Sequence, residues 1–314
     1  MDTRKILAFA AIYLIWGSTY LGIRIGIETM PPFLMAGARF LLAGLPLYLV
    51  LRLRGLPRPR AAHCGSALLL GALMLAGGNG LVTWAEQVVP SGIAAVMIAT
   101  VPLWMAGLEV WPFRGARPTL RALRGLLLGL AGVAILVAPD RAGVGAIDTL
   151  GGLALLAASF SWSFGSLLAR RLPLPRESLM TVATQMIGGG GLMLVWGLLA
   201  GEGSGLRVEA ISAHSLWALA YLIVFGSIVA LGCYVWLMKV CSAAAVSTYA
   251  FVNPLVAVFL GWLLAGETLG PRSLVAAGLI VCAVVFLQRG RAREAARAVP
   301  AADEMAPITR ERVA

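Results

Sequence analysis

Ten stretches of predominantly apolar residues occupy almost the whole chain. Each is about 20 residues long, the length that an α-helix needs to cross the hydrocarbon core of a bilayer. They are too long for the strands of a membrane barrel, which take about ten residues. We therefore predict an all-α integral membrane protein. Its ten transmembrane helices are expected at residues 6–27, 33–52, 65–85, 91–111, 119–138, 150–170, 178–200, 215–237, 242–264 and 272–289.

The composition excludes an ordinary water-soluble enzyme. Hydrophobic residues make up 60% of the chain and charged residues 12%, whereas soluble domains have about half and about a quarter. The four cysteines and two histidines show no CxxC or Cys/His spacing, and neither HExxH nor GxSxG occurs. We expect a protein that is not an enzyme and that holds no metal and no cofactor.

The net charge of +11 has a topological explanation. About four fifths of the 25 Lys and Arg residues lie at the termini and in the loops of one side of the predicted topology, and such loops face the cytoplasm. Both termini are therefore expected in the cytoplasm. No aromatic residues interleave with these charges, so nucleic acid is not an expected partner. The partners expected are the lipid bilayer and a small-molecule substrate, with the protein as a monomer.

The two halves of the chain match each other weakly. Trp16 and Arg24 in the first predicted span recur, at the same spacing, as Trp162 and Arg170 in the sixth. Each half holds five spans, and an odd number inverts the second copy in the membrane, as in many secondary transporters. The predicted units are a first five-helix repeat at 5–139, a second at 148–289, and a disordered cytoplasmic tail at 290–314.

Several short motifs resemble the EamA family of the drug/metabolite transporter superfamily, and within it the YedA-like bacterial inner-membrane proteins. The matching stretches are Ile15-Trp16-Gly17-Ser18-Thr19-Tyr20, Ala36-Gly37-Ala38-Arg39-Phe40, Gly78-Asn79-Gly80, Ala85-Glu86-Gln87, Pro90-Ser91-Gly92-Ile93-Ala94-Ala95, Ala99-Thr100-Val101-Pro102-Leu103, Tyr249-Ala250-Phe251-Val252-Asn253-Pro254 and Gly266-Glu267-Thr268-Leu269.

That resemblance implies a multi-pass protein of the bacterial cytoplasmic (inner) membrane with two inverted five-helix repeats. It implies transport of small metabolites, often outward. Because the family handles amino acids, drugs, sugars and nucleotide derivatives, the resemblance does not identify the substrate.

The candidate substrate site is expected near the midplane, around helices that are interrupted at matching positions of the two repeats. Pro102 and Pro254 lie near the centres of the fourth and ninth spans, and each removes a backbone hydrogen bond. Simple helix kinks are the alternative for these prolines, and bonds between helices are the alternative for the polar side chains. The candidates are Trp16, Ser18, Tyr20, Asn79, Thr100, Pro102, Trp162, Gln185, Tyr249, Asn253 and Pro254.

Few charged residues lie inside the spans. Arg39 and Glu86 fall toward the same side of the membrane, and we expect them to form an ion pair at the outer mouth. Glu109 lies near the inner end of the fourth span, where Arg114 is a candidate partner. No carboxylate lies in the middle of any span, which leaves proton coupling and facilitated diffusion both open.

The sequence thus predicts a transporter that exports small metabolites, such as amino acids or drugs, by alternating access. Two alternatives stay open. One is an uncoupled, channel-like facilitator, and the other is an intramembrane enzyme, for which no nucleophile and base are evident. A run of four glycines, Gly188 to Gly191, is interpreted as a close helix contact or as a hinge.

Overall fold

The computed structural model describes residues 2–89, 91–114, 119–137 and 148–265, together with 275, 278, 279, 282 and 283. Within these ranges all regular structure is helical, and helices occupy the first nine predicted spans. The predicted span at 272–289 lies almost entirely outside the described residues, and the tail at 290–314 lies wholly outside them.

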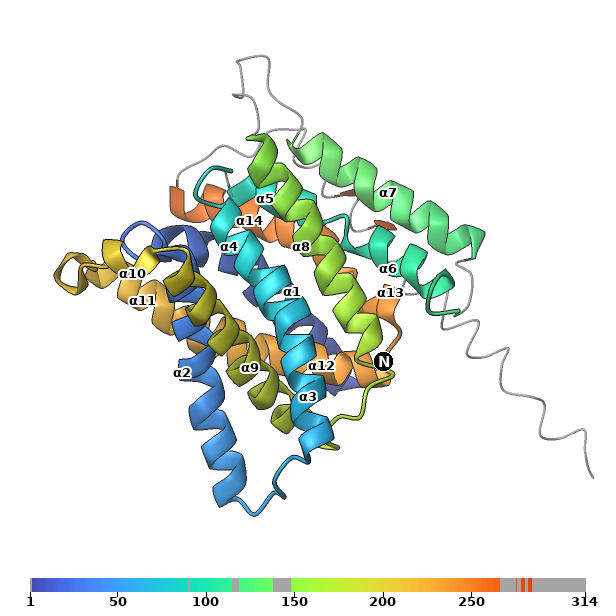
Figure 1. The fold of residues 1–314 in the computed structure, drawn as a ribbon. Coiled ribbons are helices and arrows are strands. Elements are labelled where there is room, and N and C mark those ends of the chain that lie inside the picture. The colour runs from blue at the N-terminus through green and yellow to red at the C-terminus, as the bar shows by residue number, and fades with distance from the viewer. Residues whose placement is uncertain are drawn as a thin grey trace, which may run out of the picture.

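The helices gather into one bundle (Figure 1). In chain order they are α1 (Thr3–Gly26), α2 (Pro32–Leu53), α3 (Ala61–Leu70), η1 (Gly71–Gly80), α4 (Leu81–Ala85), α5 (Ser91–Ile98), α6 (Val101–Val110), α7 (Leu120–Val137), α8 (Thr149–Leu168), α9 (Ser178–Leu199), α10 (Glu202–Gly205), η2 (Val208–Ala210), α11 (Ala213–Tyr221), η3 (Leu222–Val229), α12 (Ala230–Val240), α13 (Ala243–Val246) and α14 (Tyr249–Ala265).

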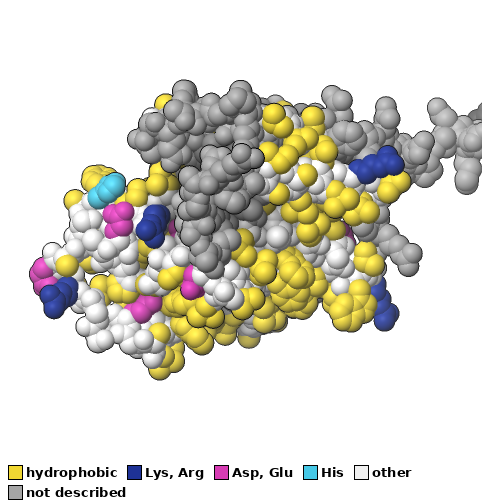
Figure 2. All heavy atoms as spheres, turned by 90° about the horizontal axis from the view of Figure 1, so that it is seen from above, with side chains coloured by type: hydrophobic (Ala, Val, Ile, Leu, Met, Phe, Trp, Pro, Cys, Tyr) yellow, Lys and Arg dark blue, Asp and Glu magenta, His cyan; other side chains and the backbone are white. Residues whose placement is uncertain are grey.

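Six helical segments among the described residues are long and apolar enough to cross a membrane. Large apolar side chains such as Leu7, Leu53 and Leu199 are exposed on the outside of the bundle, and Figure 2 shows wide hydrophobic areas on one face. Such areas would be costly in water but suit contact with lipid. The six segments are Thr3–Gly26, Pro32–Leu53, Ala61–Ala85, Thr149–Leu168, Ser178–Leu199 and Ala213–Val240.

Acidic and hydroxyl side chains bind the free N–H groups at several helix starts. The carboxylate of Asp148 accepts a hydrogen bond from the Gly151 amide at 2.6 Å, at the start of α8. At the start of α2, Glu202 accepts from the Leu34 amide at 2.9 Å. A carboxylate is favoured there because the unpaired amides and the helix dipole attract negative charge. Glu202 therefore ties the loop after α9 to the start of α2.

The most extensive helix pair is α2 with α9, and glycine makes this approach possible. A Cβ on Gly37 would lie 2.9 Å from the Leu194 amide nitrogen, and one on Gly190 would lie 3.0 Å from the Gly37 carbonyl oxygen. Lipid tails are as apolar as the helix surfaces, so close backbone packing is a main source of helix association in membranes.

The two halves of the chain show the same pattern of helix contacts, with each span of the first half corresponding to the span five places later. α1 packs on α12 and α14, the eighth and ninth spans, while α8 packs on η1 and α6, the third and fourth. α2 and α9, the second and seventh spans, correspond to each other in the two halves and pack together. The first helix of each half is thus held mainly by the other half.

The first helices of the two halves run in opposite directions. Arg24, near the end of α1, donates a hydrogen bond to the Glu86 carbonyl. Gly151, near the start of α8, lies against Val88 and Val89. The end of α1 and the start of α8 therefore lie at the same face of the bundle, which is the arrangement of an inverted repeat.

Two π-helical segments interrupt corresponding spans of the two halves. They are η1 in the third span and η3 in the eighth. The fourth and ninth spans are also interrupted, between α5 and α6 and between α13 and α14. Pro102 stands in the first turn of α6, where its missing N–H costs least. Such π-segments frequently occur at functional sites.

Candidate functional site

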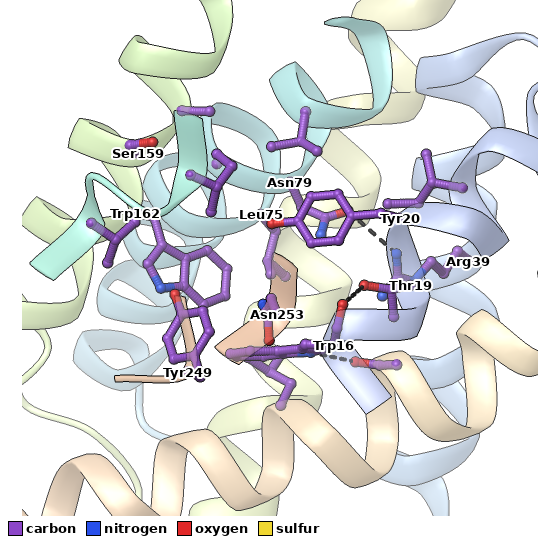
Figure 3. Close-up of a pocket in the computed structure, with 18 of the residues that line it drawn as sticks. Trp16, Thr19, Tyr20, Arg39, Leu75, Asn79, Ser159, Trp162, Tyr249 and Asn253 are labelled. Atoms are coloured by element: carbon purple, nitrogen blue, oxygen red, sulfur yellow. Dashed lines mark hydrogen bonds between the residues drawn. The ribbon is translucent and has the colours of Figure 1, made fainter. Parts of the chain in front are cut away.

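The central cavity lies inside the bundle, where the interrupted spans converge on α1, α2 and α8 (Figure 3). Its empty volume, which includes space open to solvent, is about 630 Å³. The described residues that line it are Trp16, Thr19, Tyr20, Ile23, Arg39, Phe40, Leu75, Gly78, Asn79, Val82, Ile98, Val101, Ala158, Ser159, Trp162, Gly226, Leu231, Tyr249 and Asn253.

Six of the predicted site residues line this cavity, although they come from four different spans. They are Trp16, Tyr20, Asn79, Trp162, Tyr249 and Asn253. That they bind a substrate stays a prediction. Asn253 is 2% exposed, and its side-chain oxygen has no hydrogen-bond partner. It therefore leaves one acceptor free at the cavity.

The other predicted residues lie elsewhere. The Ser18 hydroxyl contacts the Ile15 carbonyl at 2.7 Å and the Tyr221 hydroxyl at 2.5 Å, so it joins α1 to α11. The Thr100 hydroxyl donates to the Met97 carbonyl at 2.7 Å, within its own span. Pro102 and Pro254 are buried and are absent from the described cavity lining. The two prolines accompany the interrupted helices and do not themselves face the cavity.

The repeat-related tryptophans meet at the base of the cavity. The ring centroids of Trp16 and Trp162 lie 5.4 Å apart in an edge-to-face arrangement. Tyr234 and Tyr249 complete the group, at 5.1 Å and 4.9 Å from Trp16. These four residues form what we call the aromatic cluster. Edge-to-face packing of this kind is favourable beyond the area that it buries.

Hydrogen bonds fix the orientation of these rings. The indole N–H of Trp16 donates to the Gly226 carbonyl in η3 at 3.1 Å, and that of Trp162 donates to the Tyr234 hydroxyl at 3.2 Å. The Tyr234 hydroxyl in turn donates to Ser166 at 2.7 Å. Bulky rings held in this way form a defined base for the cavity.

Arg39 lies in the cavity wall and does not form the predicted ion pair with Glu86. Its Nε donates to the Ser227 hydroxyl at 2.8 Å, and its Nη1 donates to the side-chain oxygen of Asn79 at 3.4 Å. Its guanidinium also lies 4.7 Å from the centroid of the Phe40 ring. The prediction was wrong because Arg39 faces inward between η1 and η3, whereas Glu86 follows the end of α4.

Glu86 lies beside Arg24. The Arg24 guanidinium donates to the backbone carbonyl of Glu86 at 2.7 Å, while both carboxyl oxygens of Glu86 are buried without a hydrogen-bond partner. Glu109 has a neighbouring arginine as expected, but the partner is not the candidate Arg114. Glu109 instead lies 3.8 Å from Arg170, the repeat counterpart of Arg24.

A second cavity lies on the other side of the aromatic cluster, with Tyr234 in its wall. Its empty volume, which is open to solvent, is about 1390 Å³, and Arg170 and Lys239 line it. Gln185, a predicted site residue, lies here and not in the central cavity. Its side-chain oxygen is buried without a partner. The aromatic cluster therefore stands between two cavities.

Sequence reasoning missed Ser159 and Tyr234 as members of the site. No motif or repeat match in the sequence distinguishes Tyr234. Within the described residues, no three His, Cys, Asp or Glu side chains gather as metal ligands would.

The fold and the site together define a multi-pass membrane transporter built from two repeats. The EamA-like transporter family model matches the chain twice, at residues 3–138 and 149–289. The chain therefore belongs to the EamA-like transporter family.

Relatives agree with this assignment. The chain is 42% identical over 286 residues to the inner membrane transporter YedA of Escherichia coli strain K12, with 90% of each chain covered. It is 25% identical over 292 residues to a "Probable amino-acid metabolite efflux pump" of Salmonella typhimurium, with 90% and 95% covered. The protein is a multi-pass protein of the inner membrane.

A solved crystal structure has the same fold. It superposes with a TM-score of 0.74 at 19% identity, and the match covers 94% of this chain and 99% of that one. At this identity the likeness concerns the fold alone.

Proposed function

We propose that the protein exports small organic metabolites, such as amino acids or drugs, by alternating access between its two repeats. The observation that carries this proposal is the aromatic cluster, in which Trp16 and Trp162 from opposite repeats meet between two cavities. A site at the contact of two repeats can open to either side when one repeat rocks against the other.

Charge supports an orientation in the membrane, and a relative supports the direction of transport. Most of the Lys and Arg residues fall on the side where α1 begins, and positive loops face the cytoplasm. The larger cavity, lined by Arg170 and Lys239, then opens toward the cytoplasm. A relative described as an amino-acid metabolite efflux pump favours export.

Solute exchange in proteoliposomes tests the proposal. The full chain is reconstituted, loaded with a labelled amino acid and placed in buffer with or without the same solute outside. A carrier gives saturable efflux that external solute accelerates, because the loaded carrier returns faster. Linear efflux without acceleration would contradict alternating access and favour a channel-like facilitator.

Coupling is tested in the same vesicles. No acidic side chain occurs among the described residues that line the central cavity, which favours an uncoupled carrier. We therefore expect the same efflux rate with and without a pH gradient. Acceleration by the gradient would show that protons are coupled through another group.

A further inference from the structure

Arg39 is the only charged residue among the described residues that line the central cavity. It is 2% exposed and forms no ion pair with any described residue. Its two hydrogen-bond acceptors, on Ser227 and Asn79, are both neutral. A charged side chain inside a membrane is costly and marks a functional site unless it is paired.

The geometry leaves part of the guanidinium free. Nε and Nη1 make the two hydrogen bonds, while Nη2 has no hydrogen-bond partner among the described residues. Nη2 points toward Gly226, where an added Cβ would lie only 2.8 Å away. The absence of a side chain at Gly226 therefore makes room for the guanidinium at the cavity. Arg is the residue best suited to bind a carboxylate, because its planar donors match the two carboxylate oxygens.

We infer that Arg39 binds a carboxylate of the transported solute, so the central cavity selects carboxylate-bearing metabolites over organic cations. This inference rests on the proposed function, because it identifies which of the proposed solutes the cavity takes. The rest of the wall suits the remainder of such a solute. The aromatic cluster offers apolar and ring surfaces, and Asn253 offers a free acceptor. No acidic side chain among the described lining residues would hold a cation.

The alternative is that Arg39 only ties α2 to η1 and η3. A purely structural arginine would affect all solutes equally when it is replaced. A carboxylate-binding arginine would affect carboxylates selectively. The ratio between a carboxylate and its uncharged carboxamide therefore separates the two roles.

The experiment compares the wild type with Arg39→Lys, Arg39→Gln and the control Arg54→Gln, which removes an exposed arginine just after α2. The full chain is purified in detergent, and binding is measured as the thermal shift caused by each standard amino acid. The amino acids that bind best are compared with their carboxamides and with the corresponding decarboxylated amines. The same pairs are then used for efflux from proteoliposomes.

We expect the wild type and Arg54→Gln to bind the carboxylate about tenfold or more tightly than the carboxamide. The loss of a charge-assisted hydrogen bond predicts a difference in affinity of this size. Arg39→Gln should lower this preference to about twofold or less, and Arg39→Lys should retain part of it. Size-exclusion chromatography checks that each variant is folded.

Four results would overturn the inference. They are an unchanged preference in Arg39→Gln, an equal loss for acid and amide, a wild-type preference for the amines, and no stabilisation by any carboxylate. Selective binding without efflux would support the carboxylate site and contradict the proposed transport. Efflux without selectivity would support transport and contradict the carboxylate site.

Discussion

At the scale of single residues, the carboxyl group of Glu86 has neither solvent nor a hydrogen-bond partner around it. Ionising a carboxyl group in such a place costs several kcal/mol, so the neutral form is favoured even with Arg24 nearby. Glu86→Gln, which has the same shape without the charge, should therefore keep or raise the unfolding temperature in detergent at neutral pH. Differential scanning fluorimetry measures this temperature.

Glu86→Ala provides the comparison, because it removes the same group and leaves a cavity. It should lower stability by about 1–3 kcal/mol. Glu109→Gln, at a partly exposed ion pair, is the control and should change little. If Gln at position 86 were as destabilising as Ala, then Glu86 would be ionised and held by Arg24.

The internal repeat was a partial guide to individual side chains, because it matched Trp16 with Trp162 but also matched Pro102 with Pro254, which are absent from the cavity lining. The match of Trp16 with Trp162 identified two rings that lie in contact. The pairing of Arg39 with Glu86 had no such support and was wrong. A side chain's partner depends on how its helix is rotated, and apolar periodicity is weak in helices that face both lipid and protein. The partner Ser227, far along the chain, could not be found from Arg39 alone.

At the scale of helices, three of the four glycines in the run Gly188 to Gly191 of α9 pack closely against neighbouring helices. A Cβ on Gly189 would lie 2.8 Å from the Gly71 carbonyl oxygen and 2.7 Å from the Leu75 Cβ, whereas one on Gly191 would meet nothing within 4 Å. Gly189→Ala should therefore force α9 away from η1 and destabilise the protein by about 1–3 kcal/mol. The unfolding temperature and the monodisperse fraction report this loss.

Gly191→Ala is the matched control, with the same substitution two residues along the same helix. It should be neutral or stabilising by up to about 1 kcal/mol, because alanine favours the helix. If both variants kept wild-type stability and only Gly189→Ala lost transport, the run would be a hinge and not a packing surface.

Helix positions were largely predictable, and their interruptions were not. The apolar runs predicted the bounds of α1, α2, α8 and α9 to within a few residues, because bilayer thickness fixes the length of a span. The π-segments η1 and η3 left no signal in the sequence. A continuous apolar run looks the same whether its backbone bonds join every fourth or every fifth residue, so the positions of the π-segments stayed hidden.

At the scale of the whole molecule, the aromatic cluster is the barrier between two cavities, and Tyr234 is its member in the wall of the larger one. Tyr234→Ala should remove the barrier and connect the cavities. We expect efflux from proteoliposomes to rise and to lose saturation and acceleration by external solute. The measurement is the exchange assay with labelled amino acid described above.

Trp217→Ala is the control, since Trp217 is 75% exposed on the outside of the bundle. It should leave exchange unchanged. If Tyr234→Ala abolished efflux while the protein stayed folded, Tyr234 would hold the solute and not block its path.

The exchange of helix partners between the two halves has a consequence for synthesis. α1 is made first, yet its main partners α12 and α14 begin about 200 residues later. At about 5–20 residues per second, the ribosome needs roughly 10–40 s to supply them. During that time α1, with glycines at positions 17 and 22 that later contact Val256 and Leu222, stands in the bilayer without its partners. The newborn first helix must therefore be stable as a lone span, which its length and apolar surface allow.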